Sequence, residues 1–261
     1  MNPHFFPRTL STILLISIAC FLQASAFARR RRPPAGGPVA IVVDERLSAL
    51  RITPELSGKL LQRISRGRFV AIKGQTHSRE GIVFCRVKVT RRTFGWIQRD
   101  AIVSPTHTGD DERLMLLVKA SEDFDRIARA RIFLDTFTQS RLRPAVLMLF
   151  GDAAEEAALK LSRDASRRLN EAEMNASGAP QFSYFLNYNG LDRYNRQGIR
   201  FIFDRGQRKF HYDGASWREI IRRYPGSEEA EEARTRLEAI SKHSTASGRA
   251  SSENRNSVVS A

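Results

Sequence analysis

A thiol is the most reactive side chain in this sequence, and Cys85 is the one thiol outside an apolar N-terminal run that contains Cys20. A nucleophilic cysteine needs a base within hydrogen-bonding distance and commonly lies at a helix N-terminus. Cys85, Val87 and Val89 instead alternate with Phe84, Arg86 and Lys88, and Cys85 shares one strand face with Val83 and Val87. We therefore expect a buried structural thiol.

The remaining groups capable of catalysis are scattered along the chain. The sequence has no His-Glu-x-x-His, Gly-x-Ser-x-Gly or phosphate-binding glycine motif, and a metal needs three or four clustered ligands. Asp152, Glu155 and Glu156 could form an acid pair, but acidic residues at the start of a helix are more common. The histidines fall in predicted turns, linkers and the tail: His77, His107, His211 and His243. The sequence predicts a protein that is not an enzyme, with no cofactor and no metal.

Aromatic and basic side chains offer a different kind of chemistry, which is ligand contact. Phe94 and Trp96 could form an aromatic shelf, although packing inside a barrel is the favoured interpretation of Trp96. Aromatic residues between 184 and 194 either fill space between a hairpin and helices or present a surface. The candidate contact residues are Phe94, Trp96, Arg91, Arg92, Tyr188 and Tyr194.

The formal net charge of the chain is +15, with 43 Lys and Arg against 28 Asp and Glu. Such a surface attracts nucleic acid, anionic lipid or the acidic polymers of a cell envelope. A compositional preference for arginine explains the same charge equally well. Hydrophobic residues make up 41% of the chain, which is enough for folded cores.

Residues 1–28 are expected to be a secretory signal. A polar start is followed by an apolar run of about a dozen residues, too short for a membrane span of about 20 residues. Ala26 and Ala28 then supply the small residues that signal peptidase accepts. Four arginines at 29–32 oppose translocation, so an uncleaved signal anchor is the alternative. We expect a periplasmic or secreted protein without a transmembrane helix in its mature chain.

The rest of the chain divides by composition and periodicity into a multidomain α+β arrangement. Residues 29–39 are an Arg/Pro/Gly linker, 40–104 contain short strands separated by turns, and 105–112 are a polar linker. Helical spacing begins at 113 and continues to 174. Within it, alanines and leucines every four residues predict a helix over 152–169, with Asp152 as its N-cap.

The helical pattern breaks at 175–213, an insertion rich in Gly, Asn and aromatic residues. Two β-type runs flank Asp204-Arg205-Gly206-Gln207, which predicts a hairpin. Helices return over 214–242, with an interruption at Tyr224-Pro225-Gly226-Ser227. Residues 243–261 have no apolar period and are expected to be a disordered tail.

The β region resembles the bacterial SH3 domain family over about 65 residues. The matching elements are Leu47-Ser48-Ala49-Leu50-Arg51 with Pro54, Arg66-Gly67-Arg68-Phe69-Val70, Phe84-Cys85-Arg86-Val87 and Gly95-Trp96-Ile97. The resemblance implies a small SH3-like β-barrel that contacts peptidoglycan or a protein.

The second half resembles the tetratricopeptide-like repeats of periplasmic envelope and assembly proteins. Tyr224-Pro225-Gly226-Ser227 with Ala230, Ala233 and Leu237 carries the match. Phe137-Thr138-Gln139-Ser140 is a weaker copy. Since the usual repeat is about 34 residues, the two copies are too far apart unless the hairpin insertion interrupts the array.

These observations favour an exported, non-catalytic binding or scaffold protein of the cell envelope. Its partners would be envelope proteins and possibly peptidoglycan or another anionic polymer. One alternative is a basic nucleic-acid-binding protein, which the absence of a recognition motif disfavours. Another is a regulatory subunit of a cell-wall hydrolase or secretion complex, which differs only in its partner.

Overall fold

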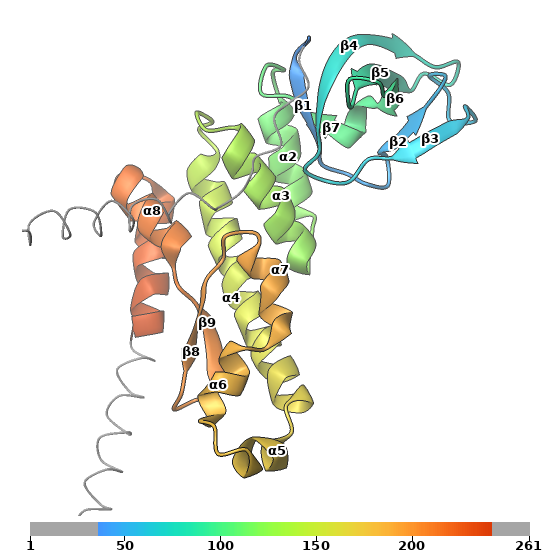
Figure 1. The fold of residues 1–261 in the computed structure, drawn as a ribbon. Coiled ribbons are helices and arrows are strands. Elements are labelled where there is room, and N and C mark those ends of the chain that lie inside the picture. Colours follow the sequence, from blue (N-terminus) through green and yellow to red (C-terminus); the bar gives the residue numbers. More distant parts are fainter. Residues whose placement is uncertain (1–35, 242–261) are drawn as a thin grey trace, which may run out of the picture. The chain divides into compact units, whose positions relative to one another are not determined.

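The computed structural model describes residues 36–241. The predicted signal peptide with Ala26 and Ala28, most of the linker 29–39 and the tail 243–261 lie outside the described residues. The described chain is a mixed α/β structure in which a seven-stranded antiparallel sheet is followed by helices (Figure 1).

The sheet has the strand order β3-β2-β6-β5-β4-β1-β7. Along the chain, the 3-10 turn η2 (Arg99–Ala101) separates β6 from β7. The strands are β1 (Val39–Val42), β2 (Ala49–Arg51), β3 (Leu60–Arg63), β4 (Phe69–His77), β5 (Val83–Lys88), β6 (Phe94–Gln98) and β7 (Ile102–Val103).

Gly95 allows β2 and β6 to approach each other closely. A Cβ atom at this position would lie 2.7 Å from Leu50 Cγ and 2.8 Å from the Arg51 carbonyl oxygen. Both distances are shorter than any normal carbon contact, so a side chain would push β2 away. The Gly-Trp step therefore brings β2 against the β5–β6 hairpin and places Arg51 opposite Trp96.

Helices make up most of the chain after Ser104, with a hairpin near the end (Figure 1). Residues 228–241 are also helical, after a break at Tyr224 to Ser227. The other elements are α2 (Asp110–Lys119), α3 (Asp123–Thr136), α4 (Arg143–Arg168), α5 (Glu171–Ala176), α6 (Gln181–Leu186), η3 (Asn189–Leu191), α7 (Asp192–Asn195), β8 (Phe201–Asp204), β9 (Lys209–Tyr212) and α8 (Ala215–Arg223).

Helix α4 corrects the prediction of a helix that begins at Asp152. It begins at Arg143, with a proline in its first turn. Pro144 suits that position because its missing N–H would have no helical partner there. Asp152 lies in the middle of the helix, where its carboxylate accepts a hydrogen bond from Arg236 Nε at 3.0 Å. It links α4 to the final helix instead of capping α4.

The predicted hairpin is present, and side chains of α4 bind the edge of β9. The backbone N–H of Phe210 donates to Ser162 Oγ at 2.7 Å, and that of Tyr212 donates to Glu155 Oε2 at 2.6 Å. These two donors face away from β8, so without α4 they would be unpaired at a strand edge. Glu155 and Ser162 lie two helical turns apart on α4, so both side chains face β9.

Glu155 also pairs with His211, and this pair predicts a pH dependence of stability. Oε1 of Glu155 lies 2.9 Å from His211 Nδ1, and this hydrogen bond raises the pKa of His211 above its ordinary value of 6.5. A raised folded-state pKa contributes stability that is complete below the unfolded pKa and is lost as pH rises through the folded pKa.

Glu155→Gln should therefore flatten the loss of stability above pH 6.5. The glutamine still offers an oxygen to the Tyr212 N–H, so the β9 edge stays paired. Urea unfolding at several pH values between about 5.5 and about 8.5, which cover the titration range of histidine, measures the free energy of unfolding of wild type and variant. Parallel profiles for the two proteins would contradict the role of this pair.

The sheet and the helices share part of their cores. One buried cluster belongs to the sheet alone and includes Leu50, Val87 and Ile97. The larger cluster, built mainly from α2, α3, α4, the hairpin and α8, also takes in Ile41 and Val103 from the sheet. Within residues 36–241, no helix is both long enough and apolar enough to span a bilayer.

Candidate functional site

Near its turn, the β5–β6 hairpin separates an apolar inner face from an outer face of cationic and aromatic side chains; Phe84, near the start of β5, lies on the outer side but is fully buried. Successive strand residues point to opposite sides, and Cys85, Val87 and Ile97 on the inner side are fully buried. Between Val83 and Gln98 the chain has four cationic residues and no acidic one. We call the outer surface the basic–aromatic face; its members are Arg51, Arg86, Lys88, Phe94 and Trp96.

Strand pairing brings these side chains together in two rows across the sheet. Trp96 is paired with Arg86 on one side and Arg51 on the other, and Phe94 is paired with Lys88. Directly opposite residues lie about 4.5–5.5 Å apart at Cβ, so each aromatic residue has a cationic residue as its cross-strand neighbour. Lys88 Nζ lies 5.7 Å from the centre of the Phe94 ring, and 41% of Phe94 is exposed.

The turn that joins the two strands adds Arg91 and Arg92, both exposed. Two hydrogen bonds to Thr93 hold this turn: Val89 N–H donates to the Thr93 carbonyl at 2.9 Å, and the Thr90 hydroxyl donates to the Thr93 hydroxyl at 2.9 Å. The arginines therefore extend from a defined turn. Four of the six predicted contact residues lie together on this hairpin.

The other two predicted contact residues, Tyr188 and Tyr194, lie in the core of the helical part. They are only 8% and 2% exposed. The Tyr194 ring packs edge-on against Phe124 at 5.4 Å and Phe201 at 5.5 Å between ring centres. These two side chains therefore fill space inside the helical part. The prediction that they contact a ligand or partner is wrong, because they are buried.

Three members of the basic–aromatic face were not among the predicted contacts: Arg51, Arg86 and Lys88. Arg86 could have been found from its alternation with Cys85 and Val87, which places it on the outer face with Lys88. Arg51 has no such signal, because its place beside Trp96 depends on the pairing of β2 with β6.

Cys85 lies inside the sheet and has no exposed surface. Burial raises the pKa of its thiol, with Arg99 acting in the opposite direction. A thiol in this setting stays protonated and out of reach of a substrate, which agrees with the expected structural role. Across residues 36–241, no group of three or more His, Cys, Asp or Glu side chains is arranged to hold a metal ion.

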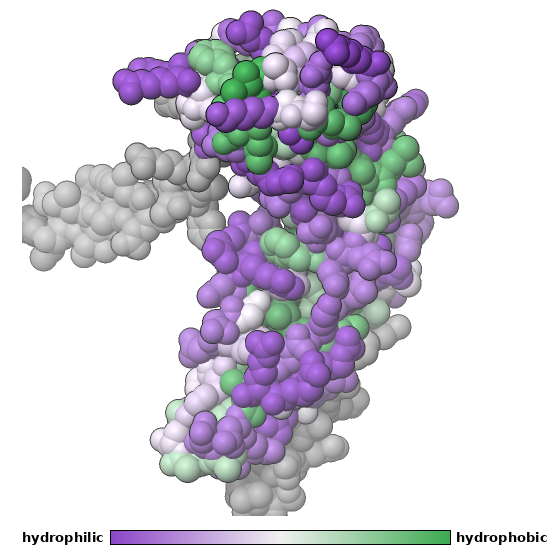
Figure 2. All heavy atoms as spheres, turned by 90° about the vertical axis from the view of Figure 1, so that its right-hand side faces the viewer, coloured by the Kyte–Doolittle hydropathy of each residue, from purple (hydrophilic) through white to green (hydrophobic). Residues whose placement is uncertain are grey.

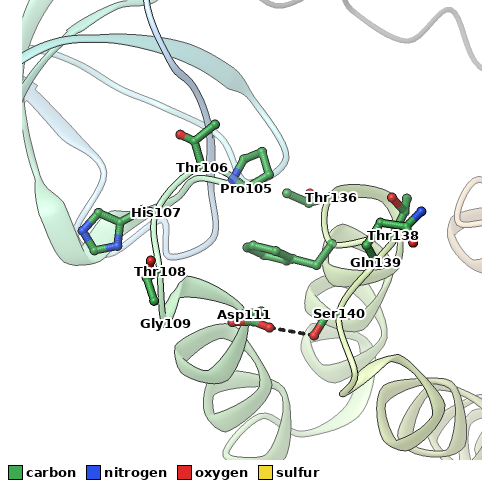
Figure 3. A pocket seen from close by; sticks show the side chains of 11 residues that line it. Pro105, Thr106, His107, Thr108, Gly109, Asp111, Thr136, Thr138, Gln139 and Ser140 are labelled. Atoms are coloured by element: carbon green, nitrogen blue, oxygen red, sulfur yellow. Dashed lines mark hydrogen bonds between the residues drawn. The ribbon is translucent and has the colours of Figure 1, made fainter.

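A cavity of about 400 Å³, lined mostly by polar residues, lies between segment 105–111 and the loop before α4. Figure 3 shows Asp111 of α2 facing Ser140, whose hydroxyl donates to the carboxylate at 2.6 Å. His107 lies on the other side of its segment in the same view, 3.6 Å from the Asp110 carboxylate. The serine is therefore bonded directly to an acid, and the contact joins α2 to the α3–α4 loop.

The edge strand β3 carries the most exposed apolar side chains of the sheet. Leu60 and Leu61 are each 46% exposed, and Ile52 in the preceding loop is 50% exposed. Figure 2 shows this side of the molecule, where green patches interrupt a largely purple surface. No acidic residue occurs from Lys59 to Arg68, so this edge is both apolar and basic.

Comparisons of the chain with protein-family models, with curated proteins and with solved structures give no match. The geometry of the chain itself therefore carries the functional argument.

Proposed function

We propose that this chain is an exported, non-catalytic binding protein of the cell envelope, and that the basic–aromatic face contacts an anionic envelope polymer such as peptidoglycan. The observation that carries the proposal is this face, where cations adjoin partly exposed aromatic rings. Rings pack against the apolar faces of sugars or side chains, and cations pair with carboxylates.

The fold assignment within this proposal is an SH3-like barrel over 40–104 and tetratricopeptide-like helices after it. The barrel is supported by a small antiparallel sheet with a 3-10 turn before its last strand. The helical assignment is supported by α8 and the helix over 228–241, which are separated by Tyr224-Pro225-Gly226-Ser227. In this proposal the helices hold an envelope protein.

The apolar edge strand β3 supports a protein partner as well. An exposed edge offers unpaired backbone groups to an added strand. Leu60 and Leu61 would supply apolar contacts, and the cations between Lys59 and Arg68 would favour a partner segment with acidic residues.

Sedimentation of the full chain with purified peptidoglycan tests the leading proposal. Phe94→Ala should weaken binding by about tenfold, because burying a phenylalanine contributes about 1.5–3 kcal/mol. Leu116→Ala is the matched control, since Leu116 is a 66% exposed apolar residue on α2. Equal binding by both variants and wild type would exclude the face as the binding surface.

A separate pair of variants tests whether the cations of this turn attract the anionic polymer. Replacing Arg91 and Arg92 together by alanine should reduce retention at low salt, with little difference left at high salt because exposed charges are then screened. Replacing the exposed Arg222 and Arg223 of α8 is the control for loss of two charges. If both double variants bind equally weakly, the total charge of the chain and not this turn attracts the polymer.

Nucleic-acid binding is the second candidate, because the same face resembles the stacking platforms that bind single strands. A labelled oligonucleotide in the same assay separates the two proposals. Retention of the oligonucleotide that depends on Phe94 and Trp96, without retention by peptidoglycan, would favour the second candidate.

A further inference from the structure

An open cavity of about 730 Å³ lies at the C-terminal end of α4, far along the chain from the basic–aromatic face. It is formed where α4, α5, α6 and the turn of the β8–β9 hairpin meet. Its apolar lining includes Leu159, Met174 and Phe185, and its cationic lining includes Arg163, Arg208 and Lys209. Its volume lies in the range of about 300–1,000 Å³ typical of small-molecule sites.

The floor of this cavity is apolar. Met174 and Phe185 are almost fully buried but border the cavity, and Leu159 is 40% exposed at its wall. The Phe185 ring stacks on Phe203 of β8 at 4.6 Å between ring centres, which fixes its position. An apolar surface held in this way can accept an alkyl or aryl group.

The rim of the cavity is strongly basic. Four cationic side chains line it, against one carboxylate, that of Glu171. Arg163 and Lys209 are exposed, and Arg208 Nη1 lies 3.2 Å from Glu171 Oε1. The rim therefore keeps a positive charge even with that ion pair formed, and it favours an anionic ligand.

Arg208 connects the rim to the floor and has an unusual backbone conformation. Its guanidinium lies 5.7 Å from the centre of the Phe185 ring. Its φ angle is +54°, in the left-handed region where glycine is preferred. The hairpin turn thus holds a guanidinium above the apolar floor at a position where glycine would be the easier residue.

We propose that this cavity binds an amphiphilic anion, in which an alkyl or aryl group carries one carboxylate, sulfonate or phosphate. The apolar part would lie against Leu159, Met174 and Phe185, and the charged group would pair with Arg163, Arg208 and Lys209. The site is separate from the basic–aromatic face, so it stands whether or not the chain binds an envelope polymer.

Isothermal titration of the full chain with dodecanoate, kept below its micelle concentration, tests the proposal. We expect saturable binding of one ligand per chain. Dodecyltrimethylammonium, which has the same alkyl length and the opposite charge, and acetate, which has no alkyl chain, should each bind at least tenfold more weakly. Equal binding of the two dodecyl compounds, or no saturable binding of dodecanoate, would overturn the proposal.

Matched arginine variants locate the site. Arg163→Ala should weaken dodecanoate binding about five- to tenfold, whereas Arg168→Ala, an exposed arginine of the same helix that does not line the cavity, should leave it unchanged. Leu159→Glu places a carboxylate at the wall and should abolish binding. Equal effects of the Arg163 and Arg168 variants would assign binding to overall charge and reject the cavity.

Arg208→Gly separates ligand binding from folding. Glycine adopts a φ of +54° without strain, so the melting temperature should be unchanged or raised while dodecanoate binding falls. A fall in melting temperature with unchanged binding would show that Arg208 has only a structural role and would contradict its place in the site.

Vesicles identify the source of the anion once dodecanoate binding is established. Capture of the chain by phosphatidylglycerol vesicles but not by phosphatidylcholine vesicles, with loss in Arg163→Ala, would assign the cavity to a lipid headgroup and its chain. Absence of capture would assign it to a free amphiphile. Vesicle capture without any binding of monomeric dodecanoate would reject the cavity as the site.

Discussion

Replacing Trp217 by alanine is expected to lower the free energy of unfolding by about 3–5 kcal/mol, the cost typical of a fully buried tryptophan. Trp217 of α8 is only 1% exposed, and its ring packs edge-on against Tyr212 at 5.4 Å between ring centres. It therefore joins α8 to the hairpin and to α4. Urea unfolding followed by far-ultraviolet circular dichroism measures the change without depending on tryptophan fluorescence.

Gly151 of α4 supplies the control for this prediction. A Cβ atom there would lie 2.4 Å from Trp217 Nε1 and 2.6 Å from Ser216 Oγ. Gly151→Ala should therefore destabilise the wild-type protein, although alanine is favoured over glycine in a helix by about 1 kcal/mol. In the Trp217→Ala background the Trp217 clash is gone, so the same substitution should cost less or become stabilising. Additive effects of the two substitutions would contradict the contact.

Asp110→Asn is the second substitution with a large expected effect, a loss of about 3–5 kcal/mol in the free energy of unfolding. The Asp110 carboxylate is 2% exposed. It accepts hydrogen bonds from Arg99 Nη2 at 2.6 Å and from the Ser104 N–H at 2.7 Å. Asparagine keeps an acceptor for Ser104 but leaves the mostly buried guanidinium of Arg99 without its counter-charge.

Glu112→Gln is the matched control in the same first turn of α2. Glu112 pairs with Arg141 at 3.1 Å, but the two side chains are 59% and 85% exposed. Exposed pairs contribute about 0–1 kcal/mol and weaken with salt. Chemical denaturation of both variants should therefore show a large effect for Asp110 and a small one for Glu112. Similar small losses would mean that Asp110 does not hold the end of the sheet to α2.

Local patterns predicted much of the secondary structure of this chain. The alternation of Cys85, Val87 and Val89 with Phe84, Arg86 and Lys88 indicated a strand, and the turn at Asp204 to Gln207 indicated the β8–β9 hairpin. The break at Tyr224-Pro225 separated two helices, as observed. Each of these signals depends on residues close in the chain, where backbone preference and side-chain period act together.

The start of α4 and the role of Asp110 were harder to predict for physical reasons. Acidic residues at 152–156 resemble a helix start, but packing against α3, α8 and β9 continues the helix back to Arg143. Asp110 lies in the polar segment 105–112, which was predicted to be a linker. Its burial depends on Arg99, eleven positions earlier, which reaches it only after the sheet has formed.

The candidate sites also divide into features set by neighbouring residues and features set by tertiary packing. Composition and strand alternation were sufficient to place Phe94, Trp96, Arg91 and Arg92 on one hairpin, because a β-hairpin is a local structure. The position of Arg51 beside Trp96, the burial of Tyr188 and Tyr194, and the cavity between Leu159 and Lys209 all depend on contacts between distant segments. Such contacts follow from how helices and strands pack, and no pattern of neighbouring residues contains that information.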